Sequence, residues 1–318
     1  SSPSRGLGDV YKRQTLSNMK PVKKKTRNWY LPMDKLQSKI EDYLEDKSNW
    51  KTNVIGQCKS WIKDGLKPRA MTRDLDWGVK VPIKDAEGKV LYVWFDAPIG
   101  YITATKELLG EEWKDYWKDN DTNLIHFIGK DNIVFHCIIF PMMLIEHGGY
   151  VLPKNVPANE FMNLEGEKIS TSRNWAVWLN DYLKEFPNMQ DELRYCLITN
   201  LPENKDSDFT WKDFQSKNNN ELVSILGNYI NRVLVLTDKF YDRIVPSCNS
   251  KNKNIIKEID SLKKSIDKSI KNFKFREAMG YVIDVARLGN KYLTDNEPWK
   301  KFNDDPENNL KQLFTYGF

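Results

Sequence analysis

A nearly apolar run over residues 133–145 lies between two strand-like runs, and this arrangement limits the fold more than any other feature of the chain. Leu124-Ile-His-Phe-Ile-Gly129 precedes the run, and Val156 to Met162 follows it. The run is too short to cross a bilayer, which takes ~20 residues. Strand, helix and strand at this spacing predict a parallel α/β sheet, whose ligands bind at the carboxyl ends of strands. We expect Asp96 and Gly129 at such ends.

Regular apolar spacing predicts further elements on both sides of this unit. Apolar residues recur at three and four positions over 36–44 and 54–62, which is typical of amphipathic helices. Runs at 78–82 and 90–95 predict two strands joined by a turn. After Asn218 the pattern becomes entirely helical, and three helices are predicted, over 221–235, 255–270 and 275–293. Three such helices indicate a helix bundle.

The composition excludes several classes of protein. Lys and Arg number 49 against 44 Asp and Glu, and this mildly basic balance permits a nucleic-acid partner without requiring one. The basic segment Lys20 to Arg27 is either solvated or an RNA contact. No secretory signal opens the chain, and the aperiodic first fourteen residues are interpreted as foreign sequence. The cysteines are scattered without a CxxC pair, which favours free thiols in a reducing cytoplasm over a zinc site (Cys58, Cys137, Cys196, Cys248).

Three segments carry residue types suited to ligand chemistry. Trp94 to Tyr101 contains a Pro–Gly turn between aromatic residues, which either closes a strand or approaches a small ligand. In Phe127 to His136, Gly129 allows close approach of a ligand, and Asp131 either accepts from ribose hydroxyls or caps a helix. Asn163 to Arg173 combines a glycine turn with lysine and hydroxyls, which is either a surface turn or a loop that stabilises a polyphosphate.

In this order and spacing the three segments resemble the methionyl-tRNA synthetase family of class I aminoacyl-tRNA synthetases. VWFDAPIGYI is similar to the methionine-pocket segment of that family, FIGKDNIVFH to its second nucleotide and methionine element, and KISTS to its KMSKS loop. Glu221 to Arg232 resembles the first anticodon-domain helix, and Glu297-Pro-Trp299 resembles the anticodon-contacting turn. The resemblance covers roughly residues 28 to 299.

The resemblance implies a role for each matching residue. The methionine side chain would be bound by Trp94, Ala97, Pro98, Tyr101 and His136, which suits a thioether because aromatic rings make favourable contacts with sulfur. ATP would be bound by Gly129, Asp131 and Lys168, with Lys168, Ser170 and Ser172 as the catalytic residues that stabilise departing pyrophosphate. The anticodon would be bound by Asn228, Arg232, Pro298 and Trp299. The role of Asn132 stays open.

Two departures from the family pattern qualify these roles. Thr171 occupies the position of the second lysine of the loop, so that Lys168 or Arg173 must supply part of the phosphate charge. The HxGH motif is absent, because His126, His136 and His147 are the only histidines and no two are three residues apart. The chain is therefore interpreted as a fragment, inactive alone. The alternatives are a non-catalytic tRNA-binding module and another class I synthetase for an aliphatic amino acid.

The predicted fold class is α/β plus all-α: the second half of a Rossmann-type catalytic domain followed by a helical anticodon-binding bundle. The predicted domains are a foreign or disordered segment (1–14), the end of a connective insertion (15–80), the Rossmann half (81–165), the KMSKS-like loop and linker (166–217) and the bundle (218–318). The implied activity is ligation of methionine to tRNA(Met) in the cytoplasm, with ATP and Mg²⁺ and no zinc site. We also expect the catalytic part to aggregate and the bundle to fold alone.

Overall fold

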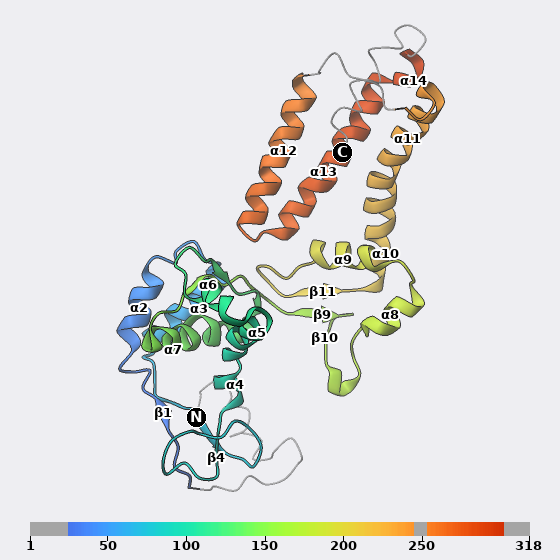
Figure 1. Ribbon diagram of the computed structural model, residues 1–318. Coiled ribbons are helices and arrows are strands. Elements are labelled where there is room, and N and C mark those ends of the chain that lie inside the picture. Colours follow the sequence, from blue (N-terminus) through green and yellow to red (C-terminus); the bar gives the residue numbers. More distant parts are fainter. Residues whose placement is uncertain (1–24, 245–252, 302–318) are drawn as a thin grey trace. The chain divides into compact units, whose positions relative to one another are not determined.

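The computed structural model describes residues 25–244 and 253–301. The chain divides into two compact units (Figure 1). Of the described residues, the first unit comprises 25–49, 57–124 and 134–154, and the second comprises 50–56, 125–133, 155–244 and 253–301. The first fourteen residues and Cys248 lie outside the described part of the chain, as does most of the basic segment 20–27.

The first unit consists mainly of short helices, with two antiparallel strand pairs. Its strands are β1 (Tyr30–Leu31) paired with β2 (Arg69–Ala70), and β3 (Thr72–Asp74) paired with β4 (Lys89–Leu91). Its helices are α2 (Gln37–Glu45), α4 (Val93–Asp96), α5 (Ile99–Leu109), η1 (Gly110–Glu112), α6 (Trp113–Trp117), the π-helix η3 (Phe135–Ile139) and α7 (Phe140–His147). Helix α3 (Thr52–Lys63) belongs to both units.

The predicted helices over 36–44 and 54–62 are confirmed as α2 and α3. Helix α2 buries Ile40 and Tyr43, which lie on one face because they are three residues apart. The Tyr43 hydroxyl donates a hydrogen bond to the Pro153 carbonyl at 2.9 Å, and burial raises its pKa. The thiols of Cys58 and Cys137 are free and fully buried, as is that of Cys196 in the second unit, so that the free-thiol prediction is confirmed for these three residues.

The predicted strand over 90–95 is wrong beyond Leu91. Strand pairing ends where the Tyr92 amide donates to the Met71 carbonyl at 2.7 Å. Helix α4 then begins, with the Phe95 amide donating back to the Tyr92 carbonyl at 2.7 Å. Burial of Phe95 favours this helical turn over a continued edge strand, so that Asp96 ends a helix and not a strand. The other predicted strand, over 78–82, is reduced to a single bridge between Lys80 and Val90.

The apolar run 133–145 is helical, as expected, but the helix is not uniform. Its first part, η3, is a π-helix, and α7 continues from Phe140 in α-helical geometry. Phe140 and Leu144 pack with Trp113 and Trp117 of α6 to form a core cluster of the first unit. The run is apolar on all sides because it is buried in this core, and among the described residues there is no helix long and apolar enough to cross a membrane.

The second unit contains small sheets and the helices that follow them. Its strands include β6 (Ile128–Gly129), β8 (Ala158–Asn159), β9 (Met162–Leu164), β10 (Glu167–Lys168) and β11 (Ser207–Phe209), with β5 (Leu124–Ile125) and β7 (Pro153–Asn155) at the unit boundary. Strand β6 pairs with β8, and β9 with β11, both in parallel, while β10 pairs antiparallel with β9. The parallel pairing predicted for this region is confirmed, although each sheet in the described chain has only two or three strands.

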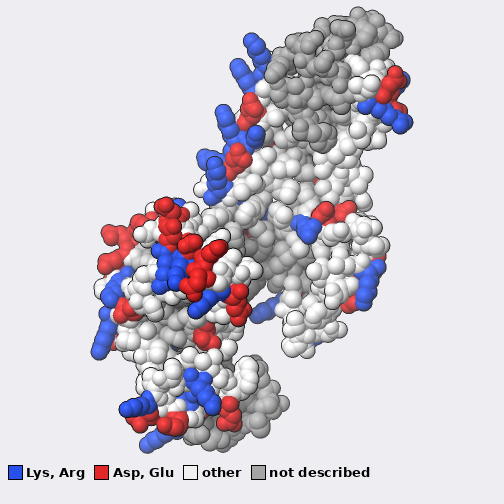
Figure 2. All heavy atoms as spheres, in the orientation of Figure 1, with Lys and Arg blue, Asp and Glu red and all other residues white. Residues whose placement is uncertain are grey.

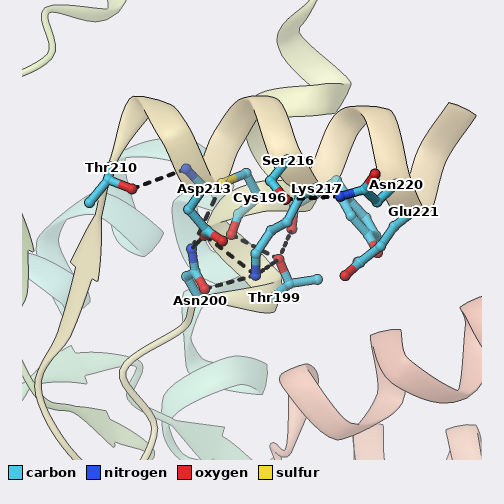
Figure 3. Close-up of polar contacts among 10 residues, drawn as sticks. Cys196, Thr199, Asn200, Thr210, Asp213, Ser216, Lys217, Asn220 and Glu221 are labelled. Carbon is cyan, nitrogen blue, oxygen red and sulfur yellow. Dashed lines mark hydrogen bonds and ion pairs between the residues drawn. The ribbon is translucent and has the colours of Figure 1, made fainter.

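A polar network joins the helices that precede the bundle (Figure 3). Helix α9 (Gln190–Thr199) and helix α10 (Trp211–Lys217) follow α8 (Leu179–Glu185). The Thr210 hydroxyl caps α10 by accepting from the Asp213 amide at 3.0 Å. Lys217 donates to Thr199 Oγ1 at 3.1 Å and to Asn200 Oδ1 at 2.8 Å. These bonds tie the end of α9 to the last turn of α10, directly before the first bundle helix.

The all-helical prediction for the C-terminal part is confirmed. Its elements are the π-helix η5 (Asn218–Gly227), α11 (Asn228–Tyr241), α12 (Lys253–Lys271), α13 (Phe275–Asn296) and α14 (Pro298–Lys301). Helices α12 and α13 pack along each other (Figure 1). The core between α11 and α13 contains Tyr229, Val233, Leu236, Ala286 and Leu293. Figure 2 shows charged side chains along the outer edge of α12, which matches its narrow apolar stripe.

Candidate functional site

The five residues expected to bind methionine all lie in the first unit, around helices α4, α5 and η3. Trp94 and Tyr101 are 48% and 43% exposed, whereas His136 is only 7% exposed. Ala97 is exposed and Pro98 is buried at the junction between α4 and α5. The Tyr101 hydroxyl lies 2.9 Å from His136 Nε2, within hydrogen-bond distance. The structure therefore brings Tyr101 and His136 together from segments 35 residues apart.

Phe135 is a neighbour of this group that the motif comparison did not single out. Its ring centroid lies 6.5 Å from that of Trp94, and the Arg69 guanidinium lies 4.9 Å from its centroid. Two half-exposed rings beside a buried, hydrogen-bonded histidine form an aromatic surface with one polar position. Such a surface suits an apolar, polarizable side chain. Its position directly before His136 in the sequence could have identified Phe135 as a further candidate for the site.

The ATP-binding candidates Gly129 and Asp131 lie at the end of β6 in the second unit. Asp131 is exposed, in the short 3₁₀ turn Lys130–Asn132. A Cβ on Gly129 would lie 2.9 Å from the Asp131 Oδ1 atom. A larger residue at Gly129 would therefore require the Asp131 carboxylate to shift. Gly129 does lie at the carboxyl end of a parallel strand, as expected.

Lys168 is exposed at the end of β10 and shares an aromatic neighbour with Lys130. The ammonium of Lys168 lies 5.4 Å from the centroid of the Phe161 ring, and that of Lys130 lies 4.4 Å from the same centroid. Phe161 was not predicted as a site residue. It brings the lysine of the loop into the neighbourhood of the Gly129 strand end, which lies 39 positions earlier in the chain.

The two lysines differ in their charge partners. Lys130 forms ion pairs with Glu160 and Asp206, both at 2.7 Å. Hydrogen bonds to these carboxylates raise the pKa of Lys130, and the bond from Lys130 lowers the pKa of Asp206, which also accepts from the Phe161 amide at 2.9 Å. The positive charge of Lys130 is thus offset locally. In the described contacts the Lys168 ammonium lies near the Phe161 ring and has no carboxylate partner. Its positive charge is therefore more available to an anion than that of Lys130.

The loop that carries the other proposed catalytic residues is an exposed turn. The backbone of Ser170 pairs with that of Trp175 through two bonds of 2.9 Å, and this closes the turn. The hydroxyls of Ser170 and Ser172 lie 3.2 Å apart. Arg173 donates to the Lys168 carbonyl at 3.2 Å, while Thr171 is exposed. Lysine, hydroxyls and guanidinium are therefore gathered on one loop.

The anticodon candidates come together in the bundle. Arg232 of α11 lies with its guanidinium 5.5 Å from the ring centroid of Trp299, which is 38% exposed. Pro298, the first residue of α14, is buried. Asn228 and Arg232 line a cavity of about 460 Å³ together with Arg287, Asn290, Lys291 and Thr294. The last four, all on α13, were not predicted.

Among residues 25–244 and 253–301, no three His, Cys, Asp or Glu side chains are grouped closely enough to hold a metal ion.

Family models match two parts of the chain. That of the class I tRNA synthetases (M) matches residues 10–234, and that of the anticodon binding domain of methionyl tRNA ligase matches residues 245–315.

The chain therefore belongs to the class I tRNA synthetases. Within that class it belongs to the methionine family, followed by the anticodon-binding domain of that family. It is 59% identical to a methionine–tRNA ligase of Cytophaga hutchinsonii, with 93% of this chain and 45% of the relative covered. It is 56% identical to that of Flavobacterium johnsoniae, with 95% and 44% covered. The chain thus spans less than half the length of these relatives.

A solved structure agrees in fold. The methionyl-tRNA synthetase of Mycobacterium tuberculosis, in complex with methionyl-adenylate, matches with a TM-score of 0.81 at 23% identity, covering 94% of this chain and 60% of that one. The predicted fold class is confirmed: a class I catalytic portion followed by a helical anticodon-binding portion. The exact boundaries between the five predicted domains stay predictions, as do the individual roles of the site residues.

Proposed function

We propose that this chain is the part of a methionine–tRNA ligase that recognises the anticodon of tRNA(Met) and supplies the methionine pocket and the phosphate loop. The supporting observation is that Asn228 and Arg232 line one cavity, and that the Arg232 guanidinium lies 5.5 Å from the ring centroid of the partly exposed Trp299. Single-stranded RNA bases stack on aromatic faces and bond at their edges to such groups. Trp299 would stack on a base, and Asn228 and Arg232 would contact base edges.

The reaction of the whole enzyme would proceed in two steps. The methionine carboxylate attacks the α-phosphate of ATP, which forms methionyl-adenylate and releases pyrophosphate. The terminal ribose of tRNA(Met) then attacks the acyl carbon and releases AMP. Magnesium would enter as the counterion of ATP. In this chain Lys168, Ser170 and Ser172 would stabilise the charge on the departing pyrophosphate, and Gly129 and Asp131 would contact the nucleoside.

The first unit would supply methionine selectivity. The rings of Trp94 and Tyr101 would contact the thioether, with His136 held in one orientation by the Tyr101 hydroxyl. Ala97 and Pro98 would shape the wall between α4 and α5. Protein synthesis takes place in the cytoplasm, and the three buried free thiols suit that reducing compartment.

Binding of RNA tests the proposal directly. The chain is titrated with a fluorescent RNA hairpin whose loop carries the methionine anticodon, and with a hairpin that has one anticodon base changed. We expect tighter binding of the first hairpin, by roughly 5- to 150-fold, because a changed base leaves a hydrogen-bonding group unpaired at a cost of ~1–3 kcal/mol. Equal binding of the two hairpins would contradict anticodon recognition.

A second assay separates the enzyme from a non-catalytic tRNA-binding module. The KISTS loop favours the enzyme, because Lys168 has no offsetting carboxylate in the described contacts, unlike Lys130. The HxGH residues are not in this chain, so we expect no methionine-dependent ATP–pyrophosphate exchange by the chain alone. Exchange should return when the preceding half of a close relative is supplied, and Lys168→Ala should abolish it. No exchange after the preceding half is supplied would favour the module, and exchange unchanged by Lys168→Ala would contradict the role of Lys168.

A further inference from the structure

A single side-chain amide on α13 connects the two α11 residues of the anticodon cavity. Asn290 Oδ1 accepts hydrogen bonds from Asn228 Nδ2 at 3.2 Å and from Arg232 at 3.3 Å. Asn290 Nδ2 donates to the Ile225 carbonyl at 2.9 Å. The Asn290 backbone carbonyl also accepts from Arg232 at 3.3 Å. Both ends of this amide are therefore engaged, and each engaged partner belongs to η5 or α11.

The contact with Ile225 matters because of the helix geometry there. Ile225 lies in the π-helix η5, and Asn228 is the first residue of α11 directly after it. A change of helical register leaves the direction of the following side chains dependent on outside contacts. Asn290 supplies one such contact, since its amide hydrogen bond joins η5 to α13.

The contact with Arg232 orders a side chain that is otherwise flexible. Thr294, one turn further along α13, accepts from both terminal nitrogens of Arg232 at 3.4 Å. Asn290 and Thr294 thus hold the guanidinium, which also lies 5.5 Å from the ring centroid of Trp299. A guanidinium that is ordered before the RNA arrives loses less conformational entropy on binding.

We propose that Asn290 is a positioning residue of the anticodon site. Its amide fixes Asn228 and Arg232 in the geometry that reads base edges, and it acts on RNA only through them. This inference rests on the proposed anticodon-binding function of the bundle. It goes beyond that function because it assigns a part in specificity to Asn290. This residue is not among those that match the family's anticodon-binding positions, which are Asn228, Arg232, Pro298 and Trp299.

A double-mutant cycle on the full chain tests the proposal. We expect Asn290→Ala to weaken binding of the methionine-anticodon hairpin by about 10-fold, the scale of a lost hydrogen bond to a charged group. Binding of the hairpin with a changed anticodon base should alter by less than about twofold. In a chain that already carries Asn228→Ala and Arg232→Ala, Asn290→Ala should add less than about twofold, because coupled residues are not additive.

Asn272→Ala is the matched control. Asn272 also donates its amide to a helix carbonyl, that of Lys268 at 2.7 Å, but lies before α13 begins. It should leave both hairpin affinities unchanged. The positioning role would be overturned if Asn290→Ala weakened binding of both hairpins equally. It would also be overturned if Asn290→Ala still weakened binding by about 10-fold in the chain that carries Asn228→Ala and Arg232→Ala.

A measurement without RNA separates this inference from the proposed function. The ¹H–¹⁵N resonances of the Arg232 Nη–H groups, which donate to Asn290 and Thr294 and are assigned with Arg232→Lys, report the order of the guanidinium. We expect a protected signal in the unmodified chain and in Asn272→Ala, and loss of protection in Asn290→Ala. If the hairpins are not distinguished but this pattern holds, anticodon recognition fails and the ordering of Arg232 stands. If the Arg232 signal is the same in all three chains, Asn290 does not position it.

Discussion

The Tyr101 hydroxyl and the Nε2 atom of His136 lie 2.9 Å apart, although the two residues belong to different helices. His136 is buried and Tyr101 is half-exposed, so the hydrogen bond lies at the boundary between the core and the aromatic surface of the first unit. A buried histidine in this position has a fixed orientation, whereas the outer face of the Tyr101 ring stays open. The bond therefore joins the packing of the core to the geometry of the proposed methionine pocket.

Tyr101→Phe should lower the stability of the first unit. The ring is kept, but the hydrogen bond to His136 is lost, which costs about 1 kcal/mol for a typical bond. Thermal unfolding followed by circular dichroism should show a lower midpoint for this variant. Tyr116→Phe removes a hydroxyl from a 57%-exposed ring of α6 and should leave the midpoint unchanged. Equal midpoints for all three proteins would show that the Tyr101 bond contributes nothing.

Gly289→Ala should destabilise the bundle. The new Cβ would lie 2.3 Å from Cε2 of the Tyr229 ring, and Tyr229 is part of the core between α11 and α13. Relief of the clash requires the helices to separate, and such overpacking costs about 1–3 kcal/mol. Urea unfolding should show the loss as a lower transition midpoint.

Gly280→Ala on the same helix is the control for Gly289→Ala. Apart from the neighbouring residues and the backbone of the helix itself, no atom lies within 4 Å of the Cβ position there. Alanine should stabilise the helix by roughly 0.5–1 kcal/mol, because glycine loses more backbone entropy on folding. Opposite signs at the two positions would confirm close packing at Gly289, whereas a stabilising effect at both would contradict it.

Asp206→Asn should destabilise the second unit in a pH-dependent way. The hydrogen bond from Lys130 lowers the pKa of Asp206 below its usual 3.8, so the ionised carboxylate is the form that stabilises the fold. Its contribution is fully present above pH 3.8 and is lost as the pH falls through the lower, folded-state value. The unmodified chain should therefore unfold at a higher temperature at neutral pH, and the difference should shrink in acid.

Thermal midpoints at a series of pH values test this expectation. Asparagine keeps an oxygen that can accept from the Phe161 amide, so the comparison isolates the charge. Asp181→Asn is the control, because its 3.8 Å pair with Lys184 is highly exposed and contributes little. A constant difference between the unmodified chain and Asp206→Asn down to strongly acidic pH would count against the ionic contribution.

Trp299→Ala should weaken binding of the methionine-anticodon hairpin. If one base stacks on the exposed indole, its loss costs ~1–3 kcal/mol, or roughly 5- to 150-fold in affinity. Fluorescence anisotropy with the labelled hairpin measures the change. Trp77→Ala removes an 84%-exposed indole of the first unit and should leave the affinity unaltered. An effect of equal size in both variants would point to nonspecific stacking.

Helices were the elements most readily predicted, and the reason is local. The apolar residues of α12 and α13 recur at helical spacing within each segment, so each helix has a continuous face to bury. The short strands were less predictable. Residues 92–95 have a strand-like composition, yet Tyr92 pairs with Met71 and Phe95 turns inward, a choice made by the neighbouring chain.

The π-helices η3 and η5 could not be foreseen from periodicity. Residues 135–139 and 218–227 have patterns that an α-helix would satisfy equally well. Their register follows from contacts with distant segments, such as the Tyr101 hydroxyl at His136 and the Asn290 amide at Ile225. The positions of His136 and Asn228 depend on these local changes of helical register.

The sequence by itself determined the helices over 36–44, 54–62, 255–270 and 275–293, where the polar loop lies and which residues match the methionine-family motifs, because these depend on neighbours within a few turns of chain. Only the tertiary structure decided which residues support them. Asn290 contacts Asn228 across 62 positions, and Phe161 lies beside both Lys130 and Lys168. Such partners are set by the packing of one element on another, and hydrogen bonds and ring contacts of this kind have no signature in the local spacing of residues.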